Sequence, residues 1–144
     1  IQEMLDDAAM AVMVLNGGSA VPLWNTWLDA LQEEAPEGDS ADASQLKAMF
    51  AHALEELSDM SGAQVGDKTM MDAFIPACEA IAACNGDEAA LFTAAAQAAQ
   101  GGAENTKNFA SKFGRAKSYG DKTIGTPDAG AVSMARFFKG LAQA

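Results

Sequence analysis

Apolar residues recur at intervals of three and four along most of the chain, which is the spacing of a helix that packs on one side. This spacing predicts helices over 1–15, from Pro22 to Leu31, over 43–57, 69–83 and 87–100, from there to about Phe113, and around Leu141. No stretch shows the alternation of apolar and polar residues that is typical of a strand. The pattern predicts an all-α fold of amphipathic helices, each antiparallel to its neighbour.

Glycines and polar stretches mark where these helices are expected to end. Gly17-Gly18 follows the first helix, and Gly101-Gly102 is expected to break the fifth, because glycine is a poor helix former. The acidic stretch 33–44 and the polar stretch 58–68 are expected to be exposed loops.

The expected helix over 69–83 contains a proline, Pro76, in its interior. An interior proline removes one backbone hydrogen bond, so a kink is expected there. The helical spacing predicts a buried stripe on this helix, formed by Met71, Phe74, Ile75, Cys78 and Ala82.

The stretch 114–130 has no apolar periodicity and contains four glycines, which predicts a long ordered loop. Loops of this length inside a compact domain usually carry function. Asp128 directly precedes the last helix, where it can cap the exposed N–H groups, and such groups also favour a bound anion. Arg115 adds a forked positive charge that suits phosphate or carboxylate.

Charge and composition narrow the class of function. A net charge of -11 and a pI near 4.2 make nucleic acid and anionic membranes poor partners, and no apolar stretch is long enough for a membrane span. The two cysteines, Cys78 and Cys84, are too few for a disulfide framework, so a cytoplasmic location is expected. The lone histidine, His52, lies on a polar helix face and is expected to be solvated.

Three segments resemble motifs of one protein family, and they occur in that family's order and spacing. They are Gly-Gly-Ser-Ala-Val-Pro-Leu at 17–23, Gly-Asp-Lys-Thr-Met-Met-Asp-Ala at 66–73, and 114–131 with its Gly-Arg-Ala, Ser-Tyr-Gly, Thr-Ile-Gly and Asp-Ala-Gly-Ala steps. The family is the nucleotide-binding L subunit, or domain, of dihydroxyacetone kinases. The resemblance implies a closed helical barrel with the nucleotide at one rim. Residues 1–144 would be a partial domain of this type, with its first part absent, since Ile1 starts inside the first expected helix.

The resemblance also implies a cofactor, ADP or ATP with Mg²⁺, and a set of contacts to it. These contacts would come from Gly18, Ser19, Ala20, Met70, Arg115, Asp128, Ala129 and Gly130. Met70 would line the adenine pocket, although core packing is an equally good interpretation of a methionine. The implied partners are a K-type subunit that binds dihydroxyacetone and, in some members, a phosphocarrier subunit of the phosphotransferase system. A homodimer also remains open.

The family holds magnesium in an aspartate-rich loop, and residues 1–144 contain no such loop. Phosphoryl transfer relies on such ions to neutralise phosphate oxygens. No metal ligand and no catalytic residue is therefore assigned, and the chain alone is expected to be incompetent. Two functions remain open: a kinase subunit that delivers phosphate from a bound nucleotide to glycerone, and a non-catalytic helical module for interaction or regulation.

Overall fold

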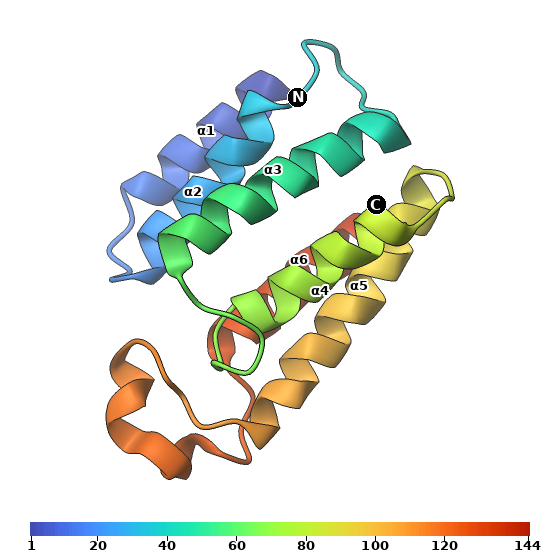
Figure 1. Cartoon of the computed structure of the whole chain (residues 1–144). Coiled ribbons are helices and arrows are strands. Elements are labelled where there is room, and N and C mark those ends of the chain that lie inside the picture. The colour runs from blue at the N-terminus through green and yellow to red at the C-terminus, as the bar shows by residue number, and fades with distance from the viewer. The chain divides into compact units, whose positions relative to one another are not determined.

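The computed structural model describes all residues, 1–144, and contains only helices, turns and loops. The α-helices are α1 (Gln2–Met13), α2 (Ala20–Glu33), α3 (Ala43–Ser61), α4 (Met71–Ala83), α5 (Glu88–Asn105) and α6 (Ala129–Gln143) (Figure 1). Two 3₁₀ helices, η1 (Thr106–Asn108) and η2 (Arg115–Thr123), lie between α5 and α6. The all-α prediction is confirmed. None of these helices combines the length and the apolar character that crossing a bilayer requires.

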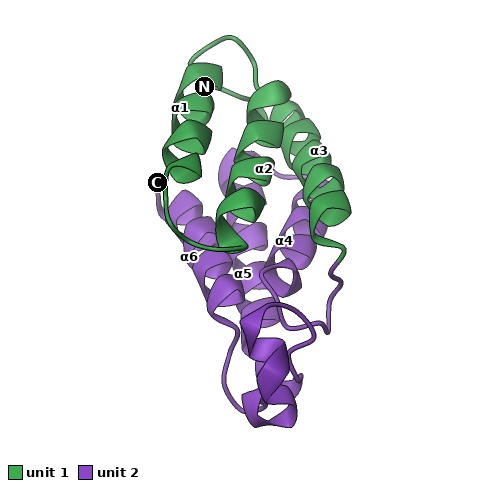
Figure 2. Cartoon of the chain, turned by 90° about the vertical axis from the view of Figure 1, so that its left-hand side faces the viewer, with its two compact units in different colours: residues 1–62 green, residues 63–144 purple.

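The chain divides into two compact units, Ile1–Gly62 and Ala63–Ala144 (Figure 2). In the first unit α2 packs against both α1 and α3. The buried side chains of this unit include Trp27 of α2 and Phe50 of α3. His52 is not merely solvated as expected, because its Nε2 lies 2.8 Å from Oε2 of Glu33 and joins α3 to α2. This hydrogen bond raises the pKa of His52 above 6.5.

In the second unit α5 packs against both α4 and α6. The rings of Phe74 and Phe138 lie 6.1 Å apart between their centroids, and both are fully buried. Alanines fill the buried stripe of α5, which allows its neighbours to pack closely; they are Ala95, Ala99 and Ala103. Cys78 is buried in this core as expected, whereas Ala82, expected to be buried, is exposed.

The expected break at Gly101-Gly102 is wrong, because α5 continues through both glycines to Asn105. A Cβ on Gly102 would lie only 1.9 Å from the backbone oxygen of Asp72 in α4. That oxygen is the one that Pro76, four residues later and without an N–H, leaves unused within α4. Glycine and proline thus mark a close approach of two helices here.

The region between α5 and α6 also differs from the prediction. The helix expected to reach Phe113 is only the short turn η1, which ends at Asn108. The expected loop 114–130 contains η2, which bends at Gly120, where φ is 51°. The structure therefore replaces one expected helix with a loop and part of one expected loop with a 3₁₀ helix.

Candidate functional site

Four of the residues that the sequence singled out lie where the starts of α4 and α6 meet. Met70 immediately precedes α4, while Asp128 to Gly130 form the start of α6. A Cβ on Gly130 would lie 3.3 Å from Cβ of Met70 and 3.1 Å from Oδ2 of Asp128. Only glycine fits comfortably at this contact, so the structure brings Met70 and the Asp128–Gly130 turn together.

Asp128 caps α6 as the sequence predicted. Its side chain accepts a hydrogen bond from the backbone N of Ala131 at 2.9 Å, and its own N–H donates to Oγ1 of Thr106 at 2.8 Å. Burial raises the pKa of the Asp128 carboxyl, and the nearby charge of Asp72 raises it further. The helix terminus that was expected to face a bound anion is thus already supplied with a carboxylate.

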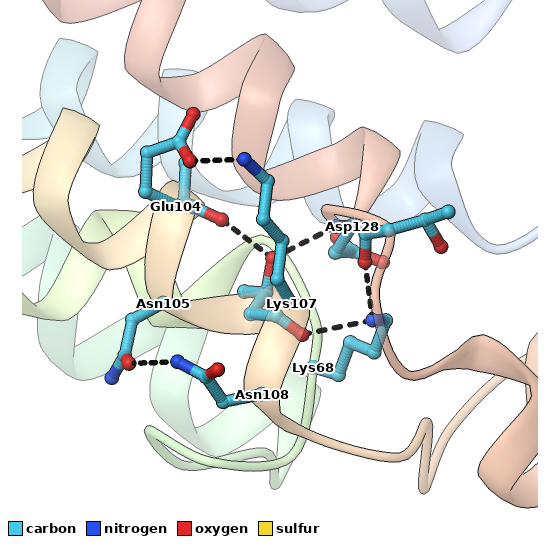
Figure 3. Close-up of polar contacts among 9 residues, drawn as sticks. Lys68, Glu104, Asn105, Lys107, Asn108 and Asp128 are labelled. Carbon is cyan, nitrogen blue, oxygen red and sulfur yellow. Dashed lines mark hydrogen bonds and ion pairs between the residues drawn. The ribbon is translucent and has the colours of Figure 1, made fainter.

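Lys68 connects the elements of this region, although the sequence pattern predicted no separate role for it. It is buried, and its Nζ donates hydrogen bonds to the backbone oxygens of Thr106, Thr123 and Thr126 at 2.8, 2.7 and 2.5 Å. Figure 3 shows the Lys68 ammonium between Asp128 and the end of α5. The three oxygens belong to the start of η1, the end of η2 and the turn before α6.

Asp72 organises the turn that leads into α4. It is 1% exposed, and its two carboxylate oxygens accept hydrogen bonds from the backbone N of Gly66 at 2.7 Å and of Thr69 at 2.8 Å. Asp67 does not cap α4. Its carboxylate instead bonds the backbone N of Gln64 and the ammonium of Lys112.

Arg115, another predicted nucleotide contact, opens η2 and is exposed. No hydrogen bond or ion pair joins its guanidinium to another residue, so all of its donors face solvent. Gly114, just before it, has a φ of 62°, which only glycine adopts easily. Arg115 is therefore a free cation that no hydrogen bond or ion pair joins to Met70 or Asp128.

The remaining three candidates lie in the first unit, where Gly18 and Ser19 precede α2 and Ala20 is its first residue. Gly18 has a φ of 58°, and Gly18, Ser19 and Ala20 are all exposed. Ser19 occupies the N-cap position of α2, yet its side chain makes no capping hydrogen bond. The turn leaves the first N–H groups of α2 without a side-chain cap, which is compatible with a bound anion.

An open depression of about 490 Å³ lies beside the α4–α5 contact. Its lining includes Pro76, Gly102 and the amides of Asn105 and Asn108, which bond each other at 2.9 Å. Nowhere in residues 1–144 do three His, Cys, Asp or Glu side chains gather in a way that could hold a metal ion.

The sequence did not single out three residues that now prove structurally central: Lys68, Asp72 and Thr106. Lys68 and Asp72 lie inside the Gly-Asp-Lys-Thr-Met-Met-Asp-Ala segment, but a lysine and an aspartate normally indicate a solvated surface. The available signal was their position in a motif that begins with Gly66, and the structure shows that this glycine has a φ of 99°. Thr106 carried no signal, because two of its partners, Nζ of Lys68 and the backbone N of Asp128, are far away in the sequence.

Comparison with known proteins assigns the whole chain to one family. The sequence profile of the DAK2 domain matches residues 1–143. An L-erythrulose 1-kinase of Mycolicibacterium smegmatis is 34% identical over 128 residues, which are 88% of this chain and 22% of that protein. The ADP-binding subunit DhaL of a PEP-dependent dihydroxyacetone kinase of Listeria innocua is 30% identical over 92% of this chain and 62% of the subunit.

The fold comparison agrees with the sequence comparison. The crystal structure of the dihydroxyacetone kinase of C. freundii matches with a TM-score of 0.71 and 26% identity, over 99% of this chain and 23% of that one. The same kinase in complex with AMP-PNP and Mg²⁺ matches with a TM-score of 0.69. This chain spans less than a quarter of the length of the erythrulose kinases. The chain thus belongs to the DAK2 domain family, the nucleotide-binding family of the dihydroxyacetone kinases.

Proposed function

We propose that this chain is the nucleotide-binding part of a kinase that phosphorylates a short ketose, dihydroxyacetone or a relative such as erythrulose. The observation that carries the proposal is the order of the three motifs at 17–23, 66–73 and 114–131, all within a family match over residues 1–143. The relatives of this chain include erythrulose kinases and ADP-binding subunits of dihydroxyacetone kinases. The proposed reaction is phosphoryl transfer to a ketose hydroxyl.

The described residues fit a nucleotide in two respects. Arg115 offers a guanidinium with no partner in the protein, which suits phosphate oxygens. Met70 and Gly130 form a tight contact at the start of two helices, and the polarisable methionine suits an adenine ring, although only 5% of its surface is exposed. In this proposal Arg115 holds phosphate, Met70 with Asp128–Gly130 holds the nucleoside, and the nucleotide supplies the phosphoryl group. The turn Gly18–Ala20 stays a separate predicted phosphate contact.

The same residues do not fit a magnesium ion. Magnesium takes oxygen ligands from one or two carboxylates together with phosphates. In the structure Asp72 and Asp128 use their carboxylates on backbone N–H groups, and no cluster of ligands is present among residues 1–144. No step of the proposed function therefore depends on a metal held by this chain.

The partner and the phosphoryl donor follow from the same proposal. A K-type subunit would hold the ketose, and the donor would be ATP or an ADP that a phosphotransferase-system phosphocarrier rephosphorylates. The Escherichia coli relative is named as the ADP-binding subunit of a PEP-dependent kinase, which supports the second donor. A cytoplasmic site of action fits the two free cysteines.

A non-catalytic role in interaction or regulation remains the second candidate. One observation favours it: the Asp128 carboxylate already occupies the start of α6, where a phosphate was expected. A carboxylate at that place repels a phosphate unless it is protonated or directed at another part of the nucleotide.

A reconstitution assay separates the two candidates. The natural full-length protein is purified without added nucleotide, and any retained nucleotide is identified by mass spectrometry. The protein is then mixed with a dihydroxyacetone-binding K-type subunit and supplied with ATP, or with PEP and the phosphocarrier proteins. The kinase proposal predicts a retained adenine nucleotide and phosphorylation of dihydroxyacetone or erythrulose. Neither retention nor turnover with either donor would leave the non-catalytic role.

A further inference from the structure

Lys68 is the one lysine of the chain that is buried, with 4% of its surface exposed. Burying an ammonium is costly unless its hydrogen-bond donors are satisfied. Lys68 directs all three donors to backbone oxygens, those of Thr106, Thr123 and Thr126, and forms no ion pair with a carboxylate. The ammonium is thus held by carbonyls alone, as a metal cation often is.

The backbone of Lys68 is also unusual. Its φ is 62°, and it is the one non-glycine residue of the chain with a positive φ. A side chain makes this conformation unfavourable, and such residues persist where the surrounding structure or the function requires them. Glycine would relieve the strain at this position but would remove the ammonium.

The three carbonyls that Lys68 binds divide the segment 106–128 into two loops. Thr106 lies at its start, Thr123 ends η2, and Thr126 lies two residues before Asp128. The loop between Thr106 and Thr123 carries Arg115. The Lys68 ammonium therefore fixes both ends of the loop that carries Arg115. It also fixes the turn that leads to Asp128, the cap of α6.

We propose that Lys68 is the positioning residue of segment 106–128, where its ammonium acts as a built-in cation that sets the place of Arg115 and Asp128. The proposal deepens the proposed nucleotide site and rests on it for its affinity readout. Lys68 itself touches no nucleotide in this proposal, because its three donors are already occupied by protein oxygens.

The same segment has a second anchor, which provides a matched control. Lys112 binds the Asp67 carboxylate at 2.7 Å, but its side chain is 62% exposed. Exposed ion pairs contribute little to stability. Lys112→Gly removes an exposed lysine of the segment and its ion pair with Asp67. Lys68→Gly removes the buried lysine that binds the three carbonyls, and it also relieves the backbone strain at that position.

The first readout is amide hydrogen exchange, followed residue by residue by NMR. The reporters are the N–H groups of Ser111, Gly125 and Asp128, which bond within segment 106–128 at 2.9, 2.7 and 2.8 Å. Lys68→Gly is expected to raise their exchange rates about tenfold or more, with amides in the middle of α5 and α6 unchanged. Lys112→Gly is expected to change the exchange of these three amides much less.

The second readout is chemical rescue of Lys68→Gly. Butylammonium replaces the missing side chain and its charge, and it is expected to restore slow exchange, whereas 1-butanol, of similar size but neutral, is not. Unchanged exchange in Lys68→Gly would overturn the proposal. Equal rescue by the alcohol would overturn it too, as would exchange that rises equally throughout α5 and α6.

The third readout is ADP affinity of the natural full-length protein. Lys68→Gly is expected to weaken binding about tenfold or more, with recovery in butylammonium. An affinity that stays unchanged while the segment exchanges faster would overturn the positioning role. If the unaltered protein binds no ADP, the proposed function fails, while the exchange and rescue results still decide whether Lys68 fixes the segment.

Discussion

Arg115 is an exposed cation without a partner, so its removal should leave the fold intact. In Arg115→Lys the charge stays, but the fork that can bind two phosphate oxygens becomes a single point charge. ADP binding by the natural full-length protein should weaken by about 1.5–3 kcal/mol, the range for a charge-assisted hydrogen bond. Calorimetric titration measures this loss, and the melting temperature without nucleotide should hardly change.

The control for Arg115 lies in the same 3₁₀ helix. Lys117 is also exposed, and Lys117→Gln removes a charge that has no assigned contact. ADP affinity in this variant should stay close to that of the unaltered protein. A large fall in stability of the nucleotide-free Arg115→Lys protein, with unchanged ADP affinity, would show that Arg115 only supports its loop.

Asp128 gives a prediction about pH. Burial first, and then the charge of Asp72, raise the pKa of Asp128 above 3.8. The folded protein thus binds this proton more tightly than the unfolded chain does, so the stabilisation is complete below pH 3.8 and is lost as the pH rises through the folded pKa. Asp128→Asn keeps a capping oxygen and cannot ionise. Its melting temperature should match or exceed that of the unaltered protein at neutral pH.

Thermal melts across a pH series test this sign. The advantage of Asp128→Asn should shrink as the solution becomes acidic and the native carboxyl takes up its proton. Asp87→Asn is the matched comparison, because Asp87 caps α5 through the same kind of bond, to the backbone N of Ala90 at 2.9 Å, but is exposed. An advantage of Asp128→Asn that grows on acidification would refute this account of the carboxyl.

At the scale of elements, the contact between α4 and α5 depends on one glycine. A Cβ on Gly102 would lie 1.9 Å from the backbone oxygen of Asp72, so Gly102→Ala forces the two helices apart. The cost should be about 1–3 kcal/mol, the usual range for overpacking. Gly101 has open space at the same place, so Gly101→Ala should instead stabilise α5 by up to about 1 kcal/mol. Chemical denaturation of both variants measures the difference, and equal effects would contradict the close contact.

The sequence predicted the helices with a strong apolar stripe, such as α3 with Met49, Phe50 and Ala53, because burial on one face follows the helical period. It did not predict that α5 continues through its two glycines, because the reason is the nearness of α4, which is not a local property. The conformation of segment 106–128 could not be predicted from the sequence either. Its shape depends on Lys68, which lies 38 residues before the first carbonyl that it binds.

For the whole molecule, the motifs indicated the family, whereas the helical pattern indicated only the fold class. An alanine-rich, all-α chain with a charge of -11 fits many functions, whereas Gly-Asp-Lys-Thr-Met and Gly-Arg-Ala-Lys-Ser-Tyr-Gly in order indicated one. The family assignment is confirmed by the match over residues 1–143. The nucleotide contacts themselves remain predictions, distributed between Gly18–Ala20 in the first unit and Met70, Arg115 and Asp128–Gly130 in the second.

Titration of ADP into the natural full-length protein, in the presence of Mg²⁺ and followed by calorimetry, tests the central claim most directly. The account predicts saturable binding of one ADP per chain, with a dissociation constant below about 1 mM. The Arg115→Lys protein should bind more weakly under the same conditions. An absence of saturable heat at millimolar ADP, from a protein that melts cooperatively, would contradict a nucleotide-binding function for this chain.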